Sequence, residues 1–283
     1  MLSSNSVLDA LSGVHAAHEW GSAPDGVPPT LRGKPFWVDL EQVTTRCAFS
    51  YVDDGWHPHW AALAEYQRDN DIDHSGSTLA RFFASFVPTT LHEALFSPAS
   101  TPIAPFDRLP PLPLDFCKRI WELDKDRVDS LLATAPENLT PRGNPHYGPV
   151  SADWVRREFG RIVRIYESVR STGYRPEHVE DGYVHGYFLV RGSRYRFVVL
   201  EGNHRLAALK VLGERRVAAT LWPSLPLVRY EHLDEVVKQR GLVFSADAAR
   251  SVFLQLFEET GRRKARDLGM EVLPGAESMV AER

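Results

Sequence analysis

Five consecutive residues in the second half of the chain combine a glycine with side chains that can bind an anion: Glu201, Gly202, Asn203, His204 and Arg205. Gly202 leaves room for a ligand to approach the backbone, and Arg205 and His204 supply hydrogen-bond donors. A helix that begins here adds free N–H groups and a dipole that favour the same negative charge. The spacing therefore predicts an anion-binding loop.

Two regular elements must hold this loop. Residues 197–200 are apolar and predict a buried strand, and residues 206–212 carry leucine and valine at helical spacing before Gly213. Residues 182–200 together predict a β-hairpin with its turn at 191–194. The loop thus leads from a hairpin strand into a helix.

A long amphipathic helix precedes the hairpin. Ser151 can cap it, Gly173 can end it, and its apolar face is formed by Trp154, Val155, Phe159, Ile162, Val163, Tyr166 and Val169. Arg156, Arg157, Arg161 and Arg164 lie mostly off that face, so we expect them in solvent. With a short strand at 217–221, the unit from 154 to 221 is helix, hairpin, loop, helix and strand.

This pattern resembles the ParB-like nucleotide-binding domain of the ParB/sulfiredoxin superfamily. The loop has the form G-x-x-R-x-x-A, with Gly202, Arg205 and Ala208, and its helix ends in Leu-Gly. His204 and the preceding Glu201 look like the D-G-H-H-R loop of the superfamily's free-serine kinases. The resemblance covers residues 154–221, and the whole layout looks like ParB-like proteins of bacterial surface-polysaccharide clusters.

The resemblance implies that the loop and the next helix hold nucleotide phosphates, with Gly202, Asn203, His204 and Arg205 in contact. Glu201 cannot favour a phosphate directly, so its expected role is to bind Mg²⁺ through water or to orient His204. Glu201, His204 and Arg205 are therefore the predicted catalytic residues, and Glu201 is the predicted metal ligand. ATP, ADP or CTP with Mg²⁺ are the expected cofactors.

Differences from the superfamily's sequence patterns reduce the number of activities that the resemblance allows. Sulfiredoxins need a cysteine where this chain has Asn203, so sulfinic-acid reduction is excluded. The partition proteins carry G-E-R-R and a helix-turn-helix domain, whereas only one convincing helix, capped by Ser245, is predicted after residue 226. The serine kinases use a carboxylate after the first strand as general base. None of the carboxylates near the first predicted strand of this chain has the spacing of that general base. These carboxylates are Asp39, Glu41, Asp53 and Asp54.

The first half of the chain predicts a loosely ordered arm at 1–34 and a mainly helical, aromatic-rich region at 35–145. That region has one strand at 36–43, helices around 60–66 and 79–86, and a capping box at Thr90 and Glu93. Prolines exclude regular structure over 97–113, a helix follows at 115–132, and a loop spans 136–149.

Three further groups have competing interpretations. In the loop before Ser151, His146 and Gly148 either contact the nucleotide or belong to a constrained turn with Tyr147. Asp53, Asp54, His57 and His59 could bind a metal, although the flanking tryptophans favour a packed aromatic loop. The basic run at 262–266 is expected at a helix end, where it complements the dipole.

The composition excludes several classes of protein. A formal net charge of -4 argues against general nucleic-acid binding, and two cysteines are too few for a disulfide framework. No apolar run has the roughly 20 residues of a membrane helix, and no signal peptide is apparent. We therefore expect a cytoplasmic protein; the sequence leaves a homodimer open.

The expected fold is α+β: a small ParB/sulfiredoxin-like mixed sheet at 146–225 packed with helices, a mainly helical region at 35–145 that walls the acceptor pocket, and a helical segment and tail at 226–283. The expected function is a nucleotide-dependent kinase that phosphorylates a small hydroxyl-bearing substrate. The alternative is a non-catalytic nucleotide-binding switch or adaptor, and a DNA-binding protein or nuclease is disfavoured.

Overall fold

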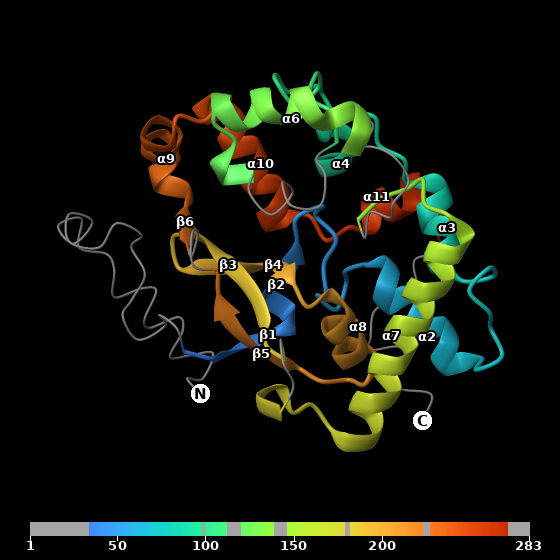
Figure 1. Cartoon of the computed structure of the whole chain (residues 1–283). Helices are drawn as coiled ribbons and strands as arrows, with labels where there is room; N and C mark the ends of the chain where they lie inside the picture. Colours follow the sequence, from blue (N-terminus) through green and yellow to red (C-terminus); the bar gives the residue numbers. More distant parts are fainter. Residues whose placement is uncertain are drawn as a thin grey trace.

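The predicted hairpin is the centre of the sheet (Figure 1). β3 (Val184–Arg191) and β4 (Arg194–Glu201) pair antiparallel, and Gly192 lies in the turn with φ 55°. Consecutive residues of both strands are buried, which means that both faces of the sheet are covered at this point. The strand that leads into the anion-binding loop is therefore part of the core.

The computed structural model describes residues 34–97, 100–111, 120–138, 146–178, 182–222 and 227–270. Within these ranges the chain is α+β, with a mixed six-stranded sheet in the order β1-β5-β3-β4-β2. β5 (Arg216–Leu221) is parallel to β3, and β6 (Leu227–Arg229) pairs with β3 beyond it. The predicted arm at 1–34, except Lys34, and the tail beyond Met270 lie outside the described residues.

The single strand predicted at 36–43 is wrong. β1 (Phe36–Asp39) is antiparallel to β5, whereas β2 (Val43–Thr45) is parallel to β4 at the other end of the sheet order. A 3₁₀ turn at Leu40–Gln42 separates them, and the Leu40 N–H donates to the Arg215 carbonyl. This turn carries the chain from one side of the sheet to the other.

Three helices pack beside the end of β4 (Figure 1). α7 (Ala152–Thr172) begins at its predicted cap, where Ser151 accepts a hydrogen bond from the Trp154 N–H, and ends at Gly173. α8 (Asn203–Val211) follows the loop, and α2 (Pro58–Arg68) contacts both. The predicted arginines Arg156, Arg157, Arg161 and Arg164 are exposed on α7.

The remaining N-terminal helices follow the predictions in part. α3 (Thr78–Ser85) is the second predicted helix, and Thr90 caps α4 (Leu91–Leu95) by accepting from the Glu93 N–H. The helix predicted at 115–132 lies outside the described residues over 115–119, and the described part differs from it, since α6 spans Lys125–Asn138 after a 3₁₀ turn at Ile120–Glu122. The loop predicted at 136–149 is therefore wrong at its start. Asp124 sets the boundary because its carboxylate accepts from the Arg127 N–H.

The C-terminal segment holds more helix than predicted. α10 (Ala246–Glu258) begins at the predicted Ser245 cap, but α9 (Leu233–Arg240) precedes it and α11 (Arg262–Asp267) follows it. The described helices include none that is both long and apolar enough to cross a membrane.

Lys264 corrects the interpretation of the basic run. Its side chain is buried, and its ammonium group donates to the carbonyls of Cys47, Ala94 and Leu95 at 3.0, 2.9 and 3.1 Å. It also lies 5.2 and 5.1 Å from the ring centroids of Phe49 and Phe86. This lysine therefore ties α11 to the N-terminal half instead of facing solvent.

We expect Lys264→Ala to lower the free energy of unfolding by about 2–4 kcal/mol, because it leaves buried carbonyls without their donor. The matched control is Arg266→Ala on the same helix, an exposed position where we expect a change within about 0.5 kcal/mol. Urea unfolding followed by circular dichroism measures both, and equal losses would contradict the role given to Lys264.

Candidate functional site

A pocket of about 810 Å³ lies at the start of α8. It contains every predicted site residue except Gly148: Glu201, Gly202, Asn203, His204, Arg205 and His146. The rest of its lining comes mainly from α7 and from the segment 173–178, whereas residues 35–145 contribute Arg46 and His59. The pocket is thus walled chiefly by α7, whereas the sequence analysis expected the helical region at 35–145 to form a wall.

Gly202 is required by the backbone at this turn. Its φ is 108°, in the region that only glycine adopts readily, and a Cβ here would lie 2.8 Å from Cγ2 of Val184. The glycine lets β4 pass directly into α8, so the unpaired N–H groups of the first helical turn start at the pocket. Their dipole favours an anion at this position.

Four arginines line the same pocket: Arg46, Arg161, Arg175 and Arg205. Arg46 follows β2 directly, and because β2 is parallel to β4 its buried guanidinium reaches the carbonyl of Leu200. Sequence reasoning missed Arg46, since nothing local to residue 46 indicates a contact across 154 positions. The four guanidinium groups add positive charge to the pocket that contains the helix start.

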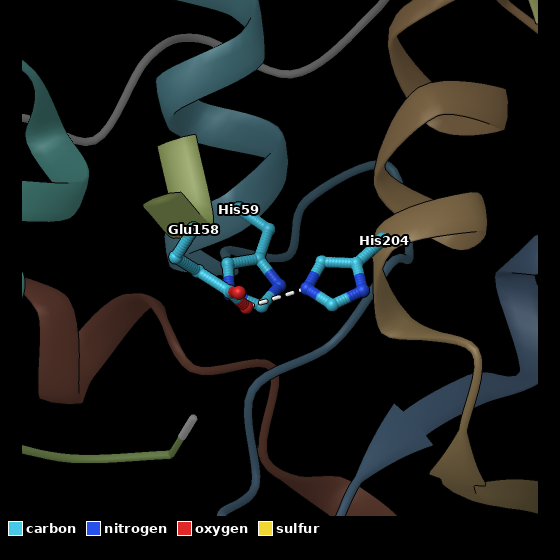
Figure 2. A group of neighbouring side chains, drawn as sticks. All are labelled: His59, Glu158 and His204. Carbon is cyan, nitrogen blue, oxygen red and sulfur yellow. Dashed lines mark hydrogen bonds and ion pairs between the residues drawn. The ribbon is translucent and has the colours of Figure 1, made fainter. Parts of the chain in front are cut away.

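A buried cluster of His59, Glu158 and His204 forms one side of the pocket (Figure 2). Nε2 of His204 lies 2.5 Å from Oε1 of Glu158, and Nε2 of His59 lies 3.7 Å from the same oxygen. The two imidazole rings are stacked with centroids 5.0 Å apart. The three side chains point toward one another from α2, α7 and α8.

Burial and charge fix the protonation of this cluster. Burial raises the pKa of the Glu158 carboxyl, but the hydrogen bond from His204 and the neighbouring positive charges outweigh it and lower that pKa to about 2. Burial lowers the pKa of His59 to about 3, and the neighbouring His204 acts in the same direction. Near neutral pH, Glu158 is therefore an anion and His59 is a neutral imidazole.

His57 and Tyr51 support the helix starts that carry His59 and His204. Nδ1 of His57 accepts from the His59 N–H at 3.2 Å and so caps α2, while its ring stacks on Tyr51 at 4.7 Å. The Tyr51 hydroxyl donates to the Asn203 carbonyl at 3.0 Å. Tyr51 and His57 thus connect the start of α2 to the start of α8.

The structure decides between the metal site and the packed aromatic loop that the sequence allowed for residues 53–59. His57 belongs to the packed aromatic layer, as the flanking tryptophans predicted, and Asp53 pairs with Lys210 at 2.6 Å. His59 faces Glu158 and His204, so the suggested metal cluster with Asp53, Asp54 and His57 does not form. Glu158 was missed, although a glutamate among the apolar positions of α7 was a readable signal.

The candidate bases of the first half do not line the pocket. Asp39 lies 3.8 Å from Arg216, and Glu41 lies 3.6 Å from Lys210. Gly148 lies outside the pocket too, and a Cβ there would meet the Phe83 carbonyl at 1.8 Å. Close packing therefore accounts for Gly148.

No protein-family model, no curated protein and no solved structure matches the chain. What the pocket can bind therefore follows from its residues. Its lining holds two carboxylates, Glu158 and Glu201, and Glu158 is already engaged by His204. Glu201 also lines the pocket beside Gly202, and a carboxylate is an oxygen ligand of the kind that Mg²⁺ prefers.

We expect the free energy of unfolding to fall between pH 7 and pH 5, by about 2 kcal/mol for His59 alone. The unfolded chain takes up a proton near pH 6.5 that buried His59 does not accept until about pH 3. Burial lowers the pKa of His57 as well, so it acts in the same direction. The stabilisation from ionised Glu158 is lost only at lower pH, as it titrates toward about 2.

Urea unfolding at pH 7 and pH 5 with EDTA present measures this dependence. His59→Gln should weaken it, while His178→Gln, at an exposed position, should leave it unchanged. The same dependence in wild type and His59→Gln would contradict the burial of a neutral imidazole.

Proposed function

We propose that this protein is a nucleotide-dependent phosphotransferase that moves a phosphoryl group from ATP, ADP or CTP to the hydroxyl of a small molecule, on a ParB/sulfiredoxin-like fold. One observation carries the proposal: Gly202, the start of α8 and four arginines converge on one pocket. Positive charge and backbone donors at a helix start are the usual means of holding phosphates. The volume of about 810 Å³ also leaves space for an acceptor.

Phosphoryl transfer depends mainly on positioning and charge neutralisation. Arg205 and the first N–H groups of α8 would hold the terminal phosphates, and Arg46 and Arg161 would add positive charge. Glu201 would hold Mg²⁺, which neutralises phosphate charge when bound. These roles fit a loop that is rigid because β4 and α8 fix both of its ends.

In the transfer, the hydroxyl oxygen of the acceptor bonds to the terminal phosphorus while the bond from that phosphorus to the bridging oxygen breaks. The nucleotide leaves with one phosphate fewer, and the hydroxyl proton passes to a base. We assign the base to the pair of His204 and Glu158, because a proton on Nε2 that is donated to Glu158 leaves Nδ1 as the acceptor.

Arg205→Ala is expected to lower kcat/KM for phosphoryl transfer about 100-fold or more, since it removes a charged phosphate ligand. The assay uses labelled ATP, ADP and CTP with Mg²⁺ against amino acids, sugars and inositols. Arg170→Ala, an exposed arginine of α7 outside the pocket lining, is the control and should keep full activity.

The outcomes separate the proposal from the adaptor alternative. Nucleotide binding that is lost in Arg205→Ala, without turnover by the wild type, would favour a nucleotide-binding switch. Neither binding nor turnover with any of the three nucleotides would contradict a nucleotide site altogether.

A further inference from the structure

We propose that His59, Glu158 and His204 form a binding site for one divalent transition-metal ion. The three residues come from three different helices, and their ligand atoms all lie within 4.8 Å of one another. This inference goes beyond the proposed function, because metal binding can be measured without nucleotide or acceptor.

The donor set determines which ion fits. Two imidazole nitrogens and one carboxylate oxygen suit Zn²⁺, Fe²⁺, Co²⁺ or Mn²⁺, and such a set leaves coordination positions for water or substrate. All three residues line the pocket, so the open positions would face it. The positive charge of Arg161 acts on both His59 and Glu158, and it disfavours any cation between them. Only an ion that bonds strongly to imidazole offsets this repulsion, which favours transition metals over Mg²⁺ or Ca²⁺.

His59 supplies an independent observation. Its side chain is 2% exposed, and neither ring nitrogen has a hydrogen-bond partner within the described part of the chain. Unsatisfied buried nitrogens are costly, and a ring aimed at a carboxylate across 3.7 Å has space for an ion between them. Coordination through Nε2 would satisfy one of these nitrogens.

The surrounding contacts also support a ligand set. His57 fixes the start of α2, and Tyr51 fixes the start of α8 at Asn203. The two imidazoles are therefore held in place before an ion arrives.

Metal binding requires one local change. Nε2 of His204 and Oε1 of Glu158, now 2.5 Å apart, must separate to bond to an ion at about 2.0–2.2 Å each. The ion would replace their hydrogen bond. A metal-loaded protein would then activate an acceptor hydroxyl through the ion instead of through His204, which is the only point that rests on the proposed function.

The test uses the full chain after treatment with a chelator. Titration with Co²⁺, followed by its visible absorption, and with Zn²⁺, followed by calorimetry, should show one ion per chain. Glu158→Gln and His204→Gln should each weaken binding by about 100-fold or more, since loss of a residue that only supports a metal ligand already costs about 10-fold to 100-fold. His178→Ala, which removes an exposed histidine of the same pocket, should bind as wild type.

The change in Tm on adding Zn²⁺ provides a second measurement in case a variant is less stable than the wild type. Zn²⁺ should raise the Tm of the wild type and of His178→Ala but not that of Glu158→Gln. Absence of binding by the wild type, or equal affinity in wild type and Glu158→Gln, would overturn the metal site. Either result would leave phosphoryl transfer and its dependence on Arg205 as a separate question.

Discussion

A carboxylate inside a protein must be paired, and Glu158 is paired with His204 and lies beside His59. The cluster links three helices, because its members belong to α2, α7 and α8. Moving α7 away from α8 would leave the buried carboxylate of Glu158 without its hydrogen-bond partner His204. The pair therefore favours the observed contact between α8, which follows Gly202, and α7, which lines the pocket.

The same arrangement would allow the proposed phosphate binding and the proposed metal or proton chemistry to share one pocket. Arg205 and the start of α8 face the pocket beside His204, which is one residue earlier in the same turn. The site thus places positive charge for an anion next to an imidazole–carboxylate pair. Elsewhere in the molecule, Lys264 is a second buried charge that links distant segments. Its ammonium group binds α11 to the carbonyls of Cys47, Ala94 and Leu95.

Local patterns were sufficient for the elements that form the loop. Hydrophobic periodicity and caps predicted the β3–β4 hairpin, α7 with Ser151, and α8 after Gly202. The split of β1 and β2 was not predictable, because the sheet partners of this segment, β4 and β5, lie far away in sequence. The meeting of His59 with Glu158 has the same origin: helical spacing shows that Glu158 lies among apolar residues but does not show which residues it faces.

We propose that the start of α8 holds the phosphates of a nucleotide, and a crystal structure with a non-hydrolysable ATP analogue and Mg²⁺ tests this proposal most directly. We expect terminal phosphate oxygens within hydrogen-bond distance of the Arg205 guanidinium and the first N–H groups of α8, with Mg²⁺ on the side of Glu201. A saturating nucleotide bound elsewhere, or with its base instead of its phosphates at Gly202, would contradict it.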